Sequence, residues 1–331
     1  MKTISVIVPC YNEEKTIKIF YDTLNFILGS TLDYNFEIIF VNDGSKDKTI
    51  DEIKKLKEAD DRIGIIDFSR NFGKEAALLA GLEVSKGEGV IVMDADLQDP
   101  PQLIPELIAN WENGHDVVYT RRKNREGEPI IRSFLAKMFY KVINKVSSVE
   151  IVDGARDYRI MSRQIVDDLL CMKEKNRFSK GLFMWVGYNS KLIEFEHMER
   201  AAGETKWSFI KLFAYAIDGI VSFSNFPLRI ASFMGTLISL LAFIFLFYIL
   251  VKTMIFKNPV NGWASMTSII LFLGGIQLLV IGIIGEYLGR IFNEVKNRPA
   301  YFVKNYYESG SNSKRKVIKN EDWHNNISLC K

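Results

Sequence analysis

Residues 89–101 have the sequence GVIVMDADLQDPP, in which a short apolar run directly precedes a group of acids. The run GVIVM predicts a buried strand, and Pro100 and Pro101 predict the start of a helix. Asp94 and Asp96 therefore follow the end of a strand, two positions apart. Such carboxylates can hold a hard divalent cation such as Mg²⁺ or Mn²⁺. An isolated Asp-x-Asp is a weak motif, so its position in the fold has to support it.

The same alternation of apolar runs and helical patterns fills the first half of the chain. Further strands are expected at residues 4–9, 36–41, 63–68 and 117–120, and helices at 13–28, 47–58 and 74–85. Strands that alternate with helices predict an α/β domain with a mainly parallel sheet. In such sheets ligands bind at the carboxyl ends of the strands, so the residues directly after each apolar run are the candidates for a site.

The turns after the first four strands are rich in acids and amides. In chain order they have the sequences PCYNEE (9–14), NDGS (42–45), SRNFGK (69–74) and DADLQD (94–99). Such residues also cap helices and build turns, and we favour that interpretation for Gly44, Ser45 and Asp47. Helix capping does not explain four turns of this kind at one edge of one sheet. The pattern therefore predicts a ligand site at that edge.

Two long apolar segments follow in the second half of the chain. Residues 230–251 carry no charge, and a second uncharged run begins at residue 267. Because a helix needs about 20 apolar residues to span a bilayer, we expect a transmembrane hairpin with helices at about 230–251 and 267–288. A buried helical hairpin of a soluble protein is the alternative.

Basic residues are distributed unevenly around this hairpin. Only Lys252 and Lys257 flank the connecting loop. The outer ends carry Arg229, Arg290, Lys296, Arg298 and Lys304. Because basic residues are enriched on the cytoplasmic side, we expect both termini and the first domain in the cytosol of a multi-pass protein of the cell membrane.

Two segments predict amphipathic helices at the membrane surface, residues 130–146 and 208–223. The first combines an apolar stripe with Lys137, Lys141 and Lys145 at four-residue spacing. A helix packed on the sheet with a solvated lysine face explains the first pattern equally well, and this alternative stays open.

The composition limits the classes of function. The chain has 331 residues with 43 Lys and Arg against 40 Asp and Glu, a net charge of +3, which excludes a strongly basic nucleic-acid binder. With 48% hydrophobic residues it is not a disordered chain. We expect a cytosolic domain at 1–225 that includes both interface helices, a transmembrane hairpin at 226–289 and a cytosolic tail at 290–331.

Several motifs in one order resemble a known family. The first four are SVIVPCYNEE (5–14), VNDGSKDKT (41–49), SRNFGKEAAL (69–78) and MDADLQDPP (93–101), and the later ones are DGARDYRIMSR (153–163), RAAGETKWSFIKL (200–212), SFSNFPLR (222–229) and YLGRIFNEVKNRPAYFV (287–303). They resemble the family-2 glycosyltransferases of the GT-A fold, and more narrowly the bactoprenol glycosyltransferases and dolichol-phosphate mannose synthases. The resemblance covers about residues 3–303.

The resemblance implies a nucleotide-sugar site at the strand ends. The residues that match this site are Pro9, Tyr11, Asn12, Glu13, Asp43, Gly73, Lys74, Asp94, Ala95, Asp96 and Gln98. Among these, Asp43 matches an acid that holds the base or ribose, and Asp94, Asp96 and Gln98 match the metal and diphosphate site with Mg²⁺ or Mn²⁺ as cofactor.

The resemblance also implies an acceptor side. Asp157 and Arg159 match an acceptor-side acid and a following arginine, and Arg200 and Lys206 match a cationic loop. An anionic lipid head group needs cations beside the site, which adds Arg122, Arg125 and Arg132 as candidates; a solvated loop explains the run from Arg121 to Arg125 as well. We expect Asp157, Asp96 and Lys206 to take part in catalysis. The chain departs from the family pattern at Tyr158 and at Thr205-Lys206-Trp207.

The expected function is an inverting transfer of a hexose from a UDP-sugar to undecaprenyl or another polyprenyl phosphate, with glucose favoured and N-acetylglucosamine second. Such an acceptor is already largely dianionic at neutral pH, so a strong general base is not obligatory. The alternatives are a GDP-mannose-dependent synthase, a processive polysaccharide synthase and a non-enzymatic membrane-tethered binder of sugar nucleotides. The bilayer is an expected partner, a nucleic acid is not, and a homo-oligomer stays open.

Overall fold

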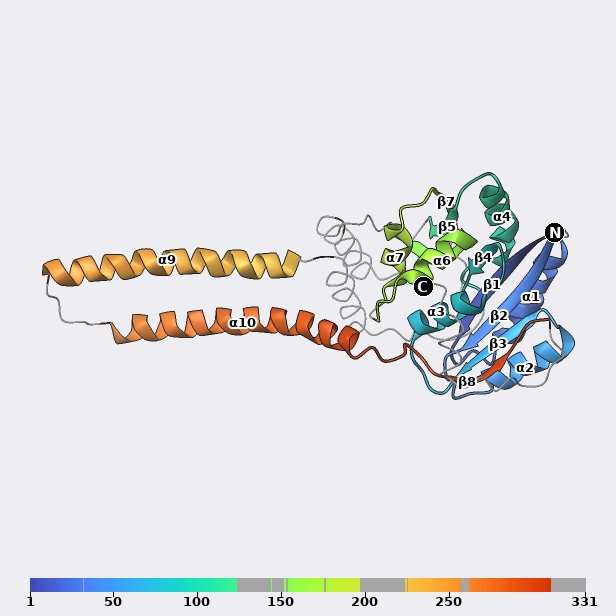
Figure 1. Cartoon of the computed structure of the whole chain (residues 1–331), viewed down its shortest axis with the longest axis horizontal. Coiled ribbons are helices and arrows are strands. Elements are labelled where there is room, and N and C mark those ends of the chain that lie inside the picture. The colour runs from blue at the N-terminus through green and yellow to red at the C-terminus, as the bar shows by residue number, and fades with distance from the viewer. Residues whose placement is uncertain are drawn as a thin grey trace.

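The computed structural model describes residues 1–31, 33–123, 144, 152, 154–175, 177–196, 224, 226–256 and 262–310. Within these ranges the chain forms an α/β domain around one sheet, and two long helices extend from it side by side (Figure 1). The expected interface helices at 130–146 and 208–223 fall outside the described residues, apart from Asn144.

The centre of the sheet is parallel. β1 (Lys2–Cys10) pairs with β2 (Tyr34–Asn42) on one side and with β4 (Gly89–Val92) on the other, and β2 pairs with β3 (Ile63–Phe68). Cys10 lies opposite Asn42 in the register, so β1 and β2 end at the same edge. The polar turns after these four strands are therefore brought together, as the sequence predicted.

The flanks of the sheet are mixed. β6 (Ala155–Ser162) runs antiparallel to both β4 and β5 (Val117–Arg122), and β7 (Ser190–Phe195) runs parallel to β5. β8 (Val303–Tyr307) runs antiparallel to β3. The order across the sheet is β7-β5-β6-β4-β1-β2-β3-β8. Because Arg159 of β6 pairs with Val92 of β4, the acceptor-side candidates lie beside the end of the acid-bearing strand.

Helices cover both faces of the sheet (Figure 1). One core cluster contains residues of α1 (Ile17–Gly29), α2 (Thr49–Ala59) and α4 (Ile104–Glu112), which follows the short helix η1 (Pro101–Leu103). The other contains residues of α3 (Lys74–Val84), α6 (Arg163–Cys171) and α7 (Ser179–Trp185). Side chains along β1 alternate between the clusters, with Val6 and Val8 in the first and Ile7 in the second, as a strand requires.

The strands and helices expected in residues 4–120 are all present, with ends that differ by a few residues. The α/β class with a largely parallel sheet is thereby confirmed. β6, α6, α7 and β7 were not predicted from the sequence. β8 was expected to belong to a tail, whereas residues 303–307 extend the sheet.

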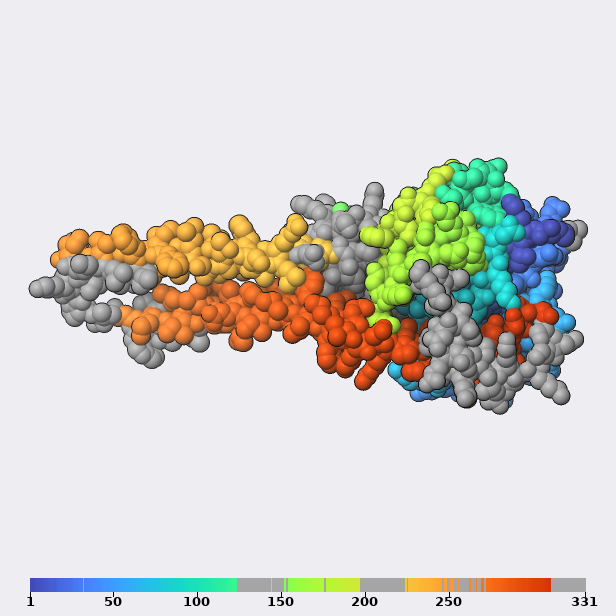
Figure 2. Space-filling model, in the orientation of Figure 1, coloured from blue at the N-terminus to red at the C-terminus, as the bar shows by residue number. Residues whose placement is uncertain are grey.

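The two long helices have the length and composition of membrane spans. α9 (Phe226–Phe256) contains a candidate span at Phe226–Phe245 with mean hydropathy 2.0, and α10 (Trp263–Val295) contains one at Phe272–Val295 with mean hydropathy 1.7. Only 6% and 0% of these windows are buried, which disfavours the buried hairpin of a soluble protein. Figure 2 shows them projecting from the α/β domain as a rod. Such apolar surface associates the protein with a membrane.

Candidate functional site

The first turn of the site is held by hydrogen bonds to the segment that leads into α2 and to its first residue, Thr49. Asn12 has a φ of 55°, its N–H donates to Ser45 Oγ at 3.0 Å, and its Oδ1 accepts from the Lys46 N–H at 2.8 Å. The Glu13 N–H donates to Thr49 Oγ1 at 2.8 Å, and its carboxylate accepts from Thr16 Oγ1 at 2.7 Å. This network fixes the turn that follows β1 at the ligand edge.

Asp43 holds the third turn. Its carboxylate accepts from the N–H of Phe72 at 2.7 Å and from that of Gly73 at 3.0 Å. Burial raises the pKa of Asp43, and these N–H donors and the Arg70 charge oppose the shift. The carboxylate that the resemblance assigns to a base or ribose therefore supports the backbone next to Lys74 in this structure.

Lys74 joins two carboxylates at the edge of the sheet. Its Nζ lies 2.7 Å from Asp94 Oδ1 and 2.6 Å from Asp157 Oδ2, and thus connects the start of α3, the end of β4 and β6. The sequence grouped Lys74 with the nucleotide residues and Asp157 with the acceptor residues. The structure brings the two into direct contact.

Charge determines the protonation of this cluster. Burial opposes the charged form of Lys74, but the carboxylates of Asp157 and Asp94 outweigh it and raise the pKa of the amine. Burial also opposes the charged form of Asp157, but Lys74 and Lys180 lower the pKa of its carboxyl. The Lys74 side chain remains 41% exposed, so water screens part of this attraction. At neutral pH the cluster therefore holds a charged Lys74 ammonium against an ionised Asp157.

The turn after Asp94 brings in Arg122. Leu97 has a φ of 59°, and this left-handed residue folds the turn so that the Gln98 N–H donates to Asp96 Oδ1 at 3.1 Å. Gln98 Oε1 accepts from Arg122 Nη2 at 2.9 Å. Arg122, predicted for the acceptor phosphate, therefore lies beside residues predicted for the metal and diphosphate.

Asp99 and Arg156 form a buried ion pair that the sequence analysis did not assign. Arg156 Nε lies 2.8 Å from Asp99 Oδ1, and Asp99 is fully buried. Burial raises the pKa of Asp99 to about 6, with the attraction of Arg156 opposing the shift. The signal available in the sequence was a third acid, three residues after the Asp-x-Asp, and an arginine directly before Asp157.

Arg159 supports Asp157 from inside the domain. It is 2% exposed, its Nη2 donates to the Arg156 carbonyl at 2.8 Å, and its Nε donates to the Asp157 carbonyl at 3.2 Å. Its guanidinium lies 3.9 Å from the centre of the Phe183 ring, and burial lowers the pKa of Arg159 to about 10. The described contacts thus make it a support for the β6 backbone.

The remaining predicted residues divide into two groups. Pro9 pairs with Val41 within the sheet, Ala95 is buried, and Tyr11 directly follows β1. Four predicted cations lie outside the described residues, namely Arg125, Arg132, Arg200 and Lys206.

A divalent metal fits the edge only as a shared site. The described residues contain no group of three or more His, Cys, Asp or Glu that could hold a metal ion alone. Asp94 and Asp96 supply two carboxylates, and Mg²⁺ commonly takes one or two protein carboxylates with substrate phosphates and water as its other ligands. The residues therefore fit a cation that is also held by a bound diphosphate. Without such a cation, Lys74 lies next to Asp94.

A parallel α/β sheet with paired carboxylates and a lysine at its carboxyl edge is suited to an enzyme that binds a phosphate-bearing ligand with a divalent cation. Comparison with known proteins makes this specific. Residues 5–170 match the model of glycosyl transferase family 2, and the chain belongs to this family. The expected GT-A glycosyltransferase fold is thereby confirmed.

Several relatives match over nearly their full length. CsbB of Bacillus subtilis (strain 168), which carries a glycosyltransferase name, is 48% identical over 91% of both chains. A prophage-derived bactoprenol glucosyl transferase of Shigella flexneri is 43% identical, over 91% of this chain and 97% of that protein. A prophage bactoprenol glucosyl transferase homolog of Escherichia coli (strain K12) is 44% identical, over 91% and 98%.

Among solved structures, a glucosyl-3-phosphoglycerate synthase from Mycobacterium tuberculosis in complex with Mn²⁺, UDP-glucose and phosphoglyceric acid aligns with a TM-score of 0.46. It is 19% identical, and the alignment covers 66% of this chain and 78% of that one.

Proposed function

We propose that the protein transfers a hexose, with glucose favoured, from a UDP-sugar to the phosphate of a polyprenyl lipid at the cytosolic face of the cell membrane. The observation that carries this proposal is the contact of Lys74 with both Asp94 and Asp157 at the carboxyl edge of the sheet, in a chain that also has two candidate membrane spans. Relatives named bactoprenol glucosyl transferase support the choice of sugar and acceptor.

The donor is assigned to the turns after β1 to β4. Asp94 and Asp96, with the Gln98 turn, would hold Mg²⁺ or Mn²⁺ against the diphosphate; when bound, the cation neutralises the charge of the leaving group. Lys74 and Arg122 place two more positive charges at this edge. Cations positioned where negative charge develops stabilise the transition state without reorganising.

The state of Asp157 favours a phosphate as the acceptor. Lys74 and Lys180 lower the pKa of Asp157 against the effect of burial, so this carboxylate is a weak base at neutral pH. A sugar hydroxyl would need a base to remove its proton, whereas a phosphate monoester with a second pKa of about 6 is already ionised. We assign Asp157 to orienting the acceptor through the Lys74 contact. Arg125, Arg132, Arg200 and Lys206 remain proposed contacts of the acceptor phosphate.

A screen of donors and acceptors tests this function. The purified full chain is incubated in detergent with Mg²⁺, undecaprenyl phosphate and one of UDP-glucose, UDP-N-acetylglucosamine, UDP-galactose or GDP-mannose, and lipid products are identified by mass spectrometry. We expect a hexosyl-phosphoryl lipid from UDP-glucose. Undecaprenol without its phosphate is the matched control and should give no product.

Three outcomes would change the account. The absence of a glycolipid with every donor would remove the transferase assignment. A product from GDP-mannose alone would replace the donor and retain the acceptor. A product from undecaprenol would contradict the role of the lipid phosphate.

A further inference from the structure

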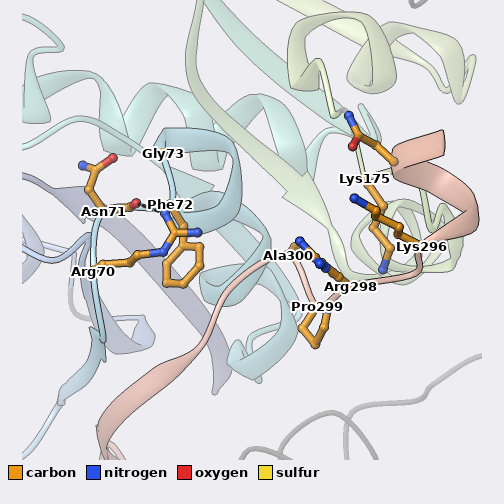
Figure 3. Close-up of a pocket in the computed structure, with 10 residues that line it drawn as sticks. Arg70, Asn71, Phe72, Gly73, Lys175, Lys296, Arg298, Pro299 and Ala300 are labelled. Atoms are coloured by element: carbon orange, nitrogen blue, oxygen red, sulfur yellow. Dashed lines mark hydrogen bonds between the residues drawn. The ribbon is translucent and has the colours of Figure 1, made fainter. Parts of the chain in front are cut away.

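A cavity of about 510 Å³ lies between the third turn of the site and the segment that follows α10 (Figure 3). Arg70, Asn71, Phe72 and Gly73 form one wall, and the opposite wall comes from the end of α10, from residues 298–300 and from the α6–α7 connection. The lining includes five long polar side chains, namely Arg70, Lys175, Asn293, Lys296 and Arg298. The sequence placed Lys296 and Arg298 at the cytosolic end of the hairpin, where an anionic membrane and a lipid phosphate would be met, but did not predict a cavity there.

The cavity is strongly cationic. Four of its ten lining residues are Lys or Arg, and none is an acid. Among the described residues, none of these four side chains forms an ion pair with a carboxylate. The nearby Glu294 accepts from the backbone N–H of Lys175 at 2.8 Å and does not line the cavity.

Aromatic rings hold two of these cations without neutralising them. The Arg70 guanidinium lies 4.1 Å from the centre of the Phe72 ring, and Lys296 Nζ lies 3.9 Å from that of Phe292. A ring face orients a cation and leaves its full charge available to an anion. These four charges come from three separate parts of the chain. The carboxyls of Asp43 and Glu83 interact with Arg70 and Lys175 from outside the cavity, and an anionic ligand inside it would reduce the remaining repulsion.

The wall after α10 is attached firmly to the sheet. Tyr301, directly after Ala300, stacks on Phe68 of β3 with ring centres 4.8 Å apart. The Phe302 carbonyl accepts from the Ser69 N–H at 3.0 Å, and residues 303–307 then pair with β3. Two of the three segments that line the cavity are therefore fixed to one strand, which favours a preformed site.

The position of the cavity selects a lipid over a soluble anion. The candidate span Phe272–Val295 ends directly before Lys296. Its uncharged part ends at Gly285, so the cationic wall lies at the end of the charged stretch of α10 that leads out of the apolar run. That is the depth at which lipid head groups meet a membrane protein, and basic pockets at this level bind phosphate-bearing head groups.

We propose that this cavity binds the phosphate head group of an anionic membrane lipid. The proposal needs the membrane spans and does not rest on the transferase assignment. The lipid phosphate would lie between Lys296 and Arg298 on one side and Arg70 and Lys175 on the other, with Asn293 as a neutral hydrogen-bond partner. Occupancy would tie the Arg70–Gly73 wall, which directly precedes Lys74, to the membrane surface.

Lipid binding by the full chain in a non-ionic detergent tests the proposal. Dioctanoyl phosphatidic acid is titrated and its adducts are counted by native mass spectrometry, with dioctanoyl phosphatidylcholine and inorganic phosphate as separate arms. We expect phosphatidic acid to bind more tightly than phosphatidylcholine and more tightly than inorganic phosphate. The double variant Lys296→Gln/Arg298→Gln should bind phosphatidic acid at least about tenfold more weakly.

The matched control is Arg229→Gln/Lys304→Gln, which removes the same charge from two exposed positions outside the cavity. It should bind like the unsubstituted chain. Lys175→Gln, in the α6–α7 connection, should independently weaken the binding of phosphatidic acid. Melting temperatures of all variants show whether they fold.

Equal weakening by the control pair would overturn the proposal, because the attraction would then be general. Unchanged binding in both Lys296→Gln/Arg298→Gln and Lys175→Gln would also overturn it. Inorganic phosphate that binds as tightly as phosphatidic acid would exclude a lipid as the ligand of this cavity.

Discussion

At the scale of the residue, Lys74 is the centre of the candidate site. Its ammonium contacts Asp94 at 2.7 Å and Asp157 at 2.6 Å, and thus links the predicted metal carboxylate to the predicted acceptor-side acid. In this position the ammonium competes with any divalent cation for Asp94. A donor with its metal at Asp94, as proposed, would have to displace or share this contact.

Replacement of Lys74 by Met should tighten metal binding in the absence of nucleotide. The substitution removes a positive charge next to Asp94, so we expect Mn²⁺ to bind the full chain roughly three- to tenfold more tightly. Electron paramagnetic resonance of free Mn²⁺ measures this directly. Lys18→Met, which removes an exposed lysine beside Asp22 on α1, is the matched control. Unchanged or weaker Mn²⁺ binding by Lys74→Met would show that Asp94 is not a metal ligand.

Gly44 shows where the backbone of the site leaves no room. It has a φ of +62°, and a Cβ added there would lie 2.3 Å from the Arg70 carbonyl carbon. Gly44→Ala should cost at least about 2 kcal/mol of the free energy of unfolding and lower the apparent melting temperature by about 5 °C. Gly29→Ala meets nothing within 4 Å and should change stability by less than about 1 kcal/mol. Similar melting temperatures for the two variants would contradict this account of the turn.

At the scale of the element, the sequence predicted the alternating half of the sheet and missed its edges. The apolar runs of β1 to β4 are buried on both faces, so each is a continuous hydrophobic stretch that periodicity detects. β6 begins at Ala155, and the polar side chains of Arg156 and Asp157 that follow belong to the candidate site and hide the strand pattern. β8 is five residues long and is defined by its pairing with distant β3, which no local pattern reports.

The candidate site was predictable to a similar degree. Residues that follow strands were found because parallel strands end at one edge. The Asp99–Arg156 ion pair was not predicted, because its partners lie 57 residues apart in the chain and meet only when β6 pairs with β4. The cationic cavity was missed for the same reason, since its walls come from three separate parts of the chain.

The contact of Tyr301, two residues before β8, with Glu83 makes the stability of the domain depend on pH. Tyr301 Oη donates to Glu83 Oε2 of α3, and burial raises the pKa of Glu83 despite that bond. Because the folded-state pKa exceeds the unfolded one, the contribution of Glu83 to stability is greatest below the unfolded value of about 4.3. It is lost as pH rises through the folded value.

Glu83→Gln should remove this dependence and keep an acceptor for Tyr301. We expect the melting temperature of the variant, relative to that of the unsubstituted chain, to rise between pH 4.5 and pH 7.5, by an amount equivalent to roughly 1 kcal/mol. Glu58→Gln on the exposed side of α2 is the control. A relative melting temperature that stays constant or falls with pH would contradict the assignment.

At the scale of the whole molecule, the protein combines an α/β domain with a two-helix rod (Figure 2). The segment after α10 returns to the sheet and pairs with β3 as β8. The chain therefore runs directly from the apolar rod into the sheet, next to the candidate site. This arrangement suits an enzyme whose donor is soluble and whose acceptor lies in a bilayer.

The proposed topology predicts different accessibility at the two ends of α10. Single cysteines at Gly262→Cys and Lys304→Cys are treated in intact cells with a membrane-impermeant maleimide, with the unsubstituted chain as the baseline. We expect Gly262→Cys to be labelled in intact cells, and Lys304→Cys only after permeabilisation. Labelling of both or of neither in intact cells would contradict a hairpin with a cytosolic catalytic domain.

We propose that Asp94 and Asp96, which follow β4, bind the donor for transfer of its sugar to a lipid phosphate. The most direct measurement is the amount of lipid-linked hexose formed from UDP-glucose, undecaprenyl phosphate and Mg²⁺ by the unsubstituted chain, by Asp96→Asn and by Asp22→Asn, the last being an exposed α1 control. We expect product from the unsubstituted chain and the control, and at least about 100-fold less from Asp96→Asn because the proposed metal site is lost. Asp96→Asn activity close to that of the unsubstituted chain would contradict it.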